Sequence, residues 1–299
     1  MRTSDYILRG LIRDLNLRFV LAETPATVAE AVRIHDTDPV ASILFGRALT
    51  AAILCSPLLT GTEQYMFRWE YRGLLRHMVV DVGADGGVRG IPGARELMHK
   101  AQNETEIFGT EDGSVSVVKS DGGQILNSGR VRAGLLDVTA DLAFFFCTSD
   151  QVETEIATAM TLNASSGRPV AAAAGIMFQA LPGCDLEAFE PMRRELHSER
   201  VHRLLGEVMP SEKKLWRLIE AVTLRRLPED GDNIVYDFAG TPEYRCRCCR
   251  EKLLAAMRTL GEEELRRLLV REEEAKITCE FCHRSYRFRK EDFFPPARE

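Results

Sequence analysis

The chain has 299 residues, of which 45% are hydrophobic and 28% charged, as in a folded soluble protein of about two domains. Its 39 Lys and Arg residues against 45 Asp and Glu residues give a net charge of −6. This balance excludes a global attraction to phosphate backbones or anionic lipid, so we expect neither nucleic acid nor membrane as a partner.

The N-terminal stretch MRTSDYILRGLIRDLNLRF lacks the uninterrupted apolar core of a signal peptide. The most apolar run, residues 40–59, contains Arg47 and Pro57, and we interpret it as a buried helix rather than a membrane span. We therefore expect a cytoplasmic protein. In that reducing compartment, clustered cysteines are more often metal ligands or redox centres than structural disulfides.

Two helices are predicted next. Thr27 and Glu30 match the capping-box pattern before VAEAVRIH, and Asp38 followed by Pro39 offers an N-cap and a first helical residue. We expect one helix to begin at each of these signals.

Strand signals follow. Aromatic and charged residues alternate over residues 65–72, and the turns ADGG and SDGG separate further apolar stretches, which predicts a largely antiparallel sheet. TSDQVETEIATAMTL is then predicted as a helix, and PVAAAAGIMFQALPG as a buried strand or apolar segment. The fold class is therefore α+β, with a core domain over residues 1–190.

Residues 191–240 are predicted to form a helical linker. Apolar residues recur there at helical spacing in two groups, namely Val201, Leu204, Leu205 and Val208, then Leu215, Leu218, Ile219 and Val222. Helices this short are marginal alone, so they are expected to dock on another surface.

The third predicted domain, residues 241–299, holds five of the eight cysteines: Cys246, Cys248, Cys249, Cys279 and Cys282. REKLLAAMRTLGEEELRRLLV predicts two helical pieces that break at Gly261, and SYRFRKEDF predicts a short strand. So little apolar material is expected to need a metal to fold.

The spacing predicts one Zn²⁺ held by four thiolates from Cys246, Cys248, Cys279 and Cys282, because two close pairs suit its tetrahedral geometry. Cys249 is then either a bystander or an alternative to Cys248. His283 is a possible nitrogen ligand, although a solvated histidine is the favoured interpretation.

Such a site could simply hold the domain together, as in a zinc ribbon that recruits RNA or a transcription component. The spacer between the pairs is longer than the roughly 15–20 residues of such ribbons. The balance of 14 basic and 12 acidic residues over 241–299 is also nearly neutral. A redox role is the other possibility, because coordinated thiolates can be attacked by an oxidant.

A thiol enzyme is a third hypothesis, with Cys147 or Cys55 as nucleophile and His77 or His35 as base. Both cysteines lie in apolar runs typical of inert buried thiols, and Cys184 is expected to be structural. We predict that the protein is not an enzyme and has no catalytic residues.

The C-x-C pair, the segments REKLLAAM and LGEEEL, and CEFCHRSYRF resemble the zinc domain of the heat shock protein 33 family, the redox-regulated 33 kDa chaperonins. The core segments FGRALTAA, DGGVRG and AAGIMFQALPG are similar to that family as well. The chain departs from the family pattern at Cys249 and His283.

This resemblance implies an ATP-independent holdase that is inactive when reduced and zinc-bound. It implies that Cys246, Cys248, Cys279 and Cys282 are both zinc ligands and redox switch, with disulfides between Cys246 and Cys248 and between Cys279 and Cys282. Oxidation would release zinc, unfold the C-terminal domain and the linker, and activate binding of unfolding client proteins. The family also implies a homodimer when oxidised and ATP-dependent chaperones that refold released clients.

Overall fold

The computed structural model describes residues 5–111, 113–164, 169–225, 233–271 and 274–294. The chain divides into two compact units, with the boundary between Tyr244 and Arg245. Antiparallel sheets and helices make up the first unit, and a smaller mixture of the same elements makes up the second. The predicted α+β class is therefore confirmed.

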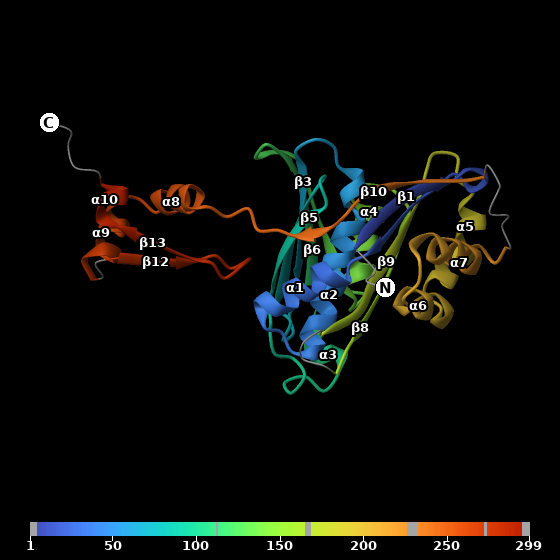
Figure 1. Cartoon of the computed structure of the whole chain (residues 1–299), viewed down its shortest axis with the longest axis horizontal. Coiled ribbons are helices and arrows are strands. Elements are labelled where there is room, and N and C mark those ends of the chain that lie inside the picture. Colours follow the sequence, from blue (N-terminus) through green and yellow to red (C-terminus); the bar gives the residue numbers. More distant parts are fainter. Residues whose placement is uncertain (1–4, 112, 165–168, 226–232, 272–273, 295–299) are drawn as a thin grey trace. The chain divides into compact units, whose positions relative to one another are not determined.

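The first unit contains a five-stranded antiparallel sheet, which we call sheet A, in the order β10-β1-β2-β9-β8 (Figure 1). Its strands are β1 (Tyr6–Ile12), β2 (Leu17–Glu23), β8 (Thr154–Leu162), β9 (Val170–Ala180) and β10 (Ile234–Gly240). The apolar segment before Pro182 is thus an interior strand, β9, which confirms the first of the two predicted alternatives.

A second sheet, sheet B, has the order β11-β5-β4-β3-β6-β7. Its strands are β3 (Glu63–Glu70), β4 (His77–Gly83), β5 (Gly87–Pro92), β6 (Gly113–Asp121), β7 (Gln124–Ala133) and β11 (Glu243–Tyr244). All pairings are antiparallel except that of β11 with β5. The predicted turn at SDGG is confirmed: it joins β6 to β7 and uses Gly122 and Gly123 at positive φ, which glycine adopts without strain.

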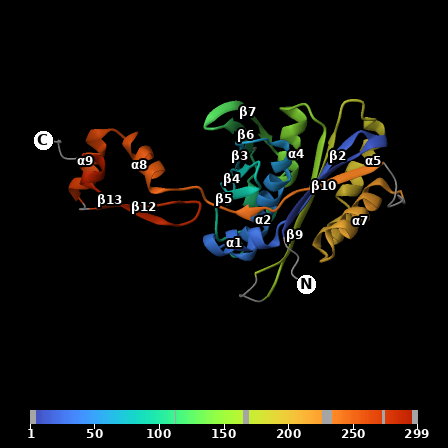
Figure 2. The same ribbon diagram turned by 45° about the horizontal axis from the view of Figure 1, so that its top comes forward.

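Helices α1 (Pro25–His35), α2 (Pro39–Leu54) and α4 (Val138–Thr148) lie between the two sheets (Figures 1 and 2). Asp38 caps α2 as predicted, since its carboxylate accepts a hydrogen bond from the Ala41 N–H at 2.8 Å. The first unit also contains the short elements η1 (Arg13–Leu15), η2 (Ser56–Leu58) and α3 (Glu104–Phe108).

Two local predictions are wrong. The first helix begins at Pro25, and Thr27 lies inside it; the Asp5 carboxylate, from outside the helix, accepts from the N–H groups of Ala26 and Thr27. The stretch from residue 148 is not a helix but leads into β8, because Thr154–Leu162 pairs with β9. The helix lies earlier, where Asp137 caps α4.

The segment Pro39–Leu58 is long and apolar enough to cross a membrane by composition, yet 78% of its most apolar window is buried inside the unit. It is the central helix of the core, in contact with strands of both sheets. The prediction of a buried helix is confirmed.

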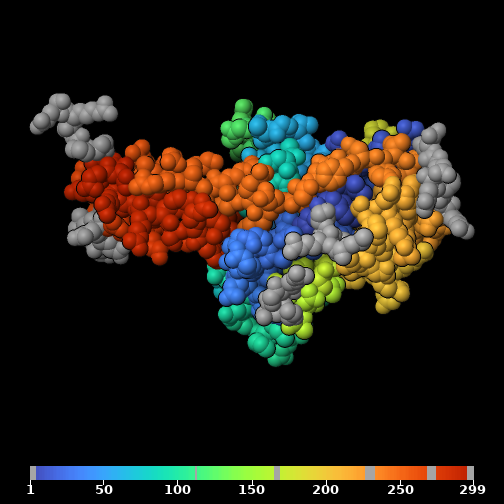
Figure 3. All heavy atoms as spheres, viewed as in Figure 1, coloured from blue at the N-terminus to red at the C-terminus, as the bar shows by residue number. Residues whose placement is uncertain are grey.

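Helices α5 (Leu186–Leu196), α6 (Glu199–Gly206) and α7 (Ser211–Thr223) cover the outer face of sheet A (Figures 1 and 2). In Figure 3 the gold atoms of α6 and α7 form a continuous outer layer of this unit. The prediction that these helices dock is confirmed. Val208 is the exception, 63% exposed, because α6 ends at Gly206 before reaching it.

The second unit contains α8 (Arg250–Arg258), α9 (Glu262–Arg271), the hairpin of β12 (Glu274–Thr278) and β13 (Ser285–Arg289), and α10 (Lys290–Phe293). The predicted break at Gly261 is confirmed, with φ at +87°. Its apolar core contains four buried side chains among the described residues, Met257, Leu265, Phe288 and Phe293. This core is small for an independently folded unit.

Candidate metal centre

The turn between β12 and β13 presents Cys279 and Cys282. The Cys279 N–H donates to the Arg284 carbonyl at 2.9 Å, and the His283 N–H donates to the Cys279 carbonyl at 2.8 Å. His283 closes this turn with φ at +55°, in the left-handed region. His283 thus contributes its backbone conformation to the turn, and its imidazole is not in the group of four described side chains that could hold a metal.

Cys246 and Cys248 lie in the extended segment before α8. Cys249 is the N-cap residue of that helix, and its carbonyl accepts the Leu253 N–H at 3.2 Å. Tyr286 of β13 holds the segment in place, since its hydroxyl lies 3.3 Å from the Cys248 carbonyl and 3.2 Å from Cys248 Sγ.

The sulfur atoms of Cys246, Cys248, Cys279 and Cys282 all lie within 4.8 Å of one another. Two contacts across the site measure 3.7 Å, from Cys246 to Cys279, and 3.5 Å, from Cys248 to Cys282. Tetrahedral Zn–S bonds of about 2.3 Å separate neighbouring sulfurs by about 3.8 Å. The donor set and its spacing therefore fit a metal ion bound by four thiolates, and Cys249 is not part of this group.

Three thiols of the cluster have shifted pKa values. Burial opposes ionisation of Cys248, but hydrogen bonds from Tyr286 and the other thiols outweigh it and lower the pKa of Cys248 to about 7. Burial raises the pKa of Cys279, and burial also raises the pKa of Cys282 to about 12. Four thiolates together would thus need a cation to balance their charge.

The other cysteines lie apart from this cluster. Cys55 is fully buried, its thiol donates to the Ala51 carbonyl at 3.4 Å, and burial raises its pKa. Burial also raises the pKa of Cys147, whose sulfur lies 3.3 Å from the Thr154 N–H, and the pKa of half-buried Cys184. None of these environments activates a thiolate nucleophile.

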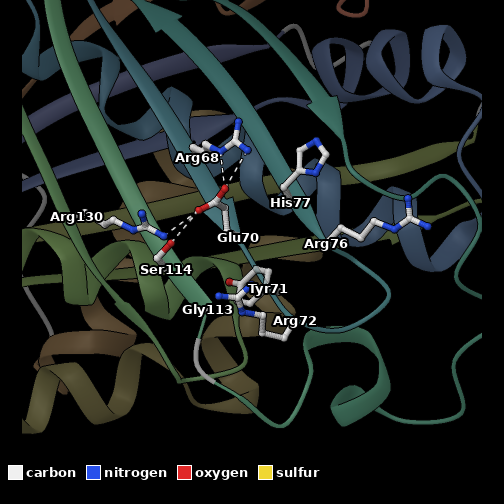
Figure 4. Close-up of a pocket in the computed structure, with 9 residues that line it drawn as sticks. All are labelled: Arg68, Glu70, Tyr71, Arg72, Arg76, His77, Gly113, Ser114 and Arg130. Atoms are coloured by element: carbon white, nitrogen blue, oxygen red, sulfur yellow. Dashed lines mark hydrogen bonds and ion pairs between the residues drawn. The ribbon is translucent and has the colours of Figure 1, made fainter.

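A surface pocket of about 350 Å³ at one end of sheet B includes His77, one of the bases considered for a thiol enzyme (Figure 4). No cysteine is among its described lining residues. Glu70 accepts hydrogen bonds there from Arg68 at 2.9 Å and Arg130 at 3.0 Å, with Ser114 at 3.2 Å. The pocket therefore brings His77 beside an arginine–glutamate network and not beside a thiol.

Tyr286 is the residue of the site that the sequence predictions missed. Strand alternation in SYRFR places Tyr286 on the same face as the buried Phe288, so a partly buried position could have been predicted. Its contact with Cys248 could not, because it depends on how the segment before α8 folds back onto the hairpin.

A family model described as Hsp33 protein matches residues 5–289. The chain belongs to the Hsp33 family. It is 28% identical over 295 residues to the 33 kDa chaperonin of Bacillus licheniformis, and this match covers 96% of this chain and 97% of the relative. It is 29% identical over 291 residues to the 33 kDa chaperonin of Geobacillus kaustophilus, covering 96% and 95%.

The crystal structure of the Hsp33 homologue of Thermotoga maritima, also a 33 kDa chaperonin, matches with a TM-score of 0.79 at 22% identity. The match covers 97% of this chain and 96% of that one. This Hsp33 protein therefore shares the fold of its homologue across both units.

Proposed function

We propose that this protein is a redox-regulated, ATP-independent holdase chaperone, as its membership of the Hsp33 family implies. One observation carries the proposal: four thiols from two distant segments converge in a unit whose described apolar core is small. Chemistry at these thiols would control whether that unit stays folded. The proposed function needs no catalytic residue.

Cys246, Cys248, Cys279 and Cys282 would hold one Zn²⁺ in the reduced protein. Bound zinc would keep the four sulfurs deprotonated and link the segment before α8 to the β12–β13 turn. The fit of the donor set supports this assignment.

Oxidation would pair Cys246 with Cys248 and Cys279 with Cys282. Each disulfide would form as two thiolates give up two electrons to one molecule of hydrogen peroxide, whose O–O bond breaks, and two protons from solvent complete two waters. Two peroxides would therefore convert four thiolates into two disulfides. Without thiolate donors the unit would lose zinc and unfold.

The linker would carry this change to the client-binding surface. Helices α5 to α7 cover apolar side chains of sheet A, including Phe19, Leu21, Ile176 and Phe178, each 0% exposed. If the linker unfolds with the C-terminal unit, this face and the apolar stripes of the helices become available to unfolding proteins.

The proposal assigns residues 1–190 to a core chaperone domain, 191–240 to a redox-sensitive linker and 241–299 to a zinc-binding switch. The active, oxidised form would be a homodimer in the cytoplasm. It would hold clients under oxidative stress for ATP-dependent chaperones to refold.

The test measures aggregation of citrate synthase at mild heat with the reduced, zinc-loaded protein and with protein treated with peroxide. We expect suppression of aggregation after peroxide only. Equal activity in the two states would overturn the switch.

Counts of zinc and free thiols before and after peroxide test the chemistry. One zinc and eight thiols should fall to no zinc and four thiols, since the chain has eight cysteines. A loss of five or more thiols would implicate Cys249 or a cysteine of the core instead.

A further inference from the structure

A buried ion pair lies between the linker helices and sheet A. Lys214, in the first turn of α7, bonds through Nζ to the carboxylate of Glu23 at the end of β2. The two side chains are 1% and 5% exposed. Lys214 Nζ also donates to the Leu205 carbonyl of α6 at 3.0 Å. One lysine therefore ties α6 and α7 to the sheet.

Little space for solvent lies beside the pair. A space of about 10 Å³ beside it is lined by both charged residues, by Leu205 and by alanines of β9 such as Ala173. That is about the smallest volume that holds one water. Because both side chains are almost fully buried, the charge of each is compensated mainly by the other, with the Leu205 carbonyl as a further acceptor for Lys214.

Each charge is in an unfavourable position without its partner. Burial raises the pKa of Glu23, an effect that Lys214 opposes and that the neighbouring carboxylate of Asp5 reinforces. Lys214 is the fourth residue of α7, where the positive end of the helix dipole disfavours a cation. Within the docked structure, each charge therefore needs its partner.

A buried ion pair differs from an apolar contact in what happens on release. When the helices leave the sheet, both charges regain hydration, which offsets part of the lost attraction. Apolar side chains of similar volume would instead expose apolar surface to water, and such replacements often stabilise a buried contact. An ion pair in this position makes docking specific while keeping it easy to reverse.

We propose that the Glu23–Lys214 pair is the release element of the linker, which sets how readily α6 and α7 leave sheet A. This inference rests on the proposed function for its purpose, since release is what would uncover the client-binding face. The docking equilibrium itself can be measured without any chaperone activity.

The test is hydrogen exchange by mass spectrometry on peptides from residues 199–223 in the full-length, reduced, zinc-loaded protein. Lys214→Met leaves the buried Glu23 carboxylate without its counter-ion, and Glu23→Met does the same to the Lys214 ammonium, so each should speed exchange at least about tenfold. The double variant Glu23→Met with Lys214→Met should slow exchange below that of the unmodified protein. Lys213→Met is the matched control, because Lys213 is exposed on the same helix, and should change nothing.

The double variant keeps the proposal testable even where a single variant fails to fold. Exchange in the double variant that equals or exceeds that of the unmodified protein would overturn the release role. So would single variants that exchange like the Lys213→Met control.

Chaperone activity is then measured separately after peroxide. Slow exchange in the double variant together with a delayed onset of activity supports both proposals. Slow exchange with an unchanged onset of activity still supports the role of the Glu23–Lys214 pair in docking. It contradicts the proposal that release of the linker activates the chaperone.

Discussion

The two units of this protein maintain their folds by different means. The first buries large aromatic side chains such as Phe67 and Trp69 between two sheets and a central helix. The second has a described core of four buried apolar side chains and a cluster of four thiols. Oxidants do not affect the burial of apolar surface, but they attack coordinated thiolates. Sensitivity to oxidants can therefore be confined to one unit of a chain.

The largest expected effect comes from removing one thiol. Cys248→Ser should abolish zinc binding and unfold the second unit, because coordination in such modules supplies about 10–16 kcal/mol of apparent binding free energy. Zinc content and limited proteolysis measure the result, with residues 1–190 remaining protease-resistant. Cys249→Ser is the matched control and should retain zinc and switching, since Cys249 lies outside the cluster; zinc loss there would contradict the ligand assignment.

Truncating a buried phenylalanine should have different consequences in the two units. Phe67→Ala and Phe288→Ala each remove a fully buried ring and should each cost about 3–5 kcal/mol of unfolding free energy. Only Phe288→Ala should weaken zinc affinity, because metal binding is coupled to folding in the second unit. Competition with a chelator measures the affinity. Equal zinc affinities in the two variants would contradict separate folding.

A smaller effect is expected at the hydroxyl that contacts the site. Tyr286→Phe removes the hydrogen bond to Cys248 and should lower zinc affinity by about 10- to 100-fold. It should also speed zinc release by peroxide, measured with a metal-sensitive dye. Tyr236→Phe, which removes a hydroxyl in the first unit, provides the control. Unchanged release kinetics would show that the Tyr286 contact does not tune the thiols.

The smallest effect is expected from pH on the linker. His197 of the linker bonds to Glu155 of sheet A at 2.8 Å, and this hydrogen bond raises the pKa of His197 although burial opposes it. Because the folded-state pKa of His197 is raised, the ion pair stabilises the fold fully at a pH below the ordinary histidine pKa of about 6.5. This stabilisation is lost as the pH rises through the folded-state pKa.

His197 is half exposed, so the loss between pH 6 and pH 8 should stay below about 1 kcal/mol. Urea unfolding at the two pH values measures it. His197→Gln should flatten the difference, and an undiminished pH dependence in that variant would assign the effect to another group.

Much of the fold followed from local patterns. The Asp38–Pro39 signal predicted the start of α2, because a cap is a local interaction. The helix predicted over the stretch that became β8 was wrong, because pairing with β9 overrides local preference. Asp5 replaces the predicted Thr27 cap for a similar reason, since it reaches α1 from outside the helix.

For the site, the C-x-C and C-x-x-C spacing was enough to identify the four cysteines that could act together, because it restricts the thiols that can reach one point. The contact of Tyr286 with Cys248 and the burial of Lys214 against Glu23 depend instead on how distant segments pack. A lysine beside an apolar stripe is expected at the surface, and nothing near it in the chain indicates otherwise. Its partner is nearly two hundred residues away, so only the docking of α7 on sheet A brings the two charges together.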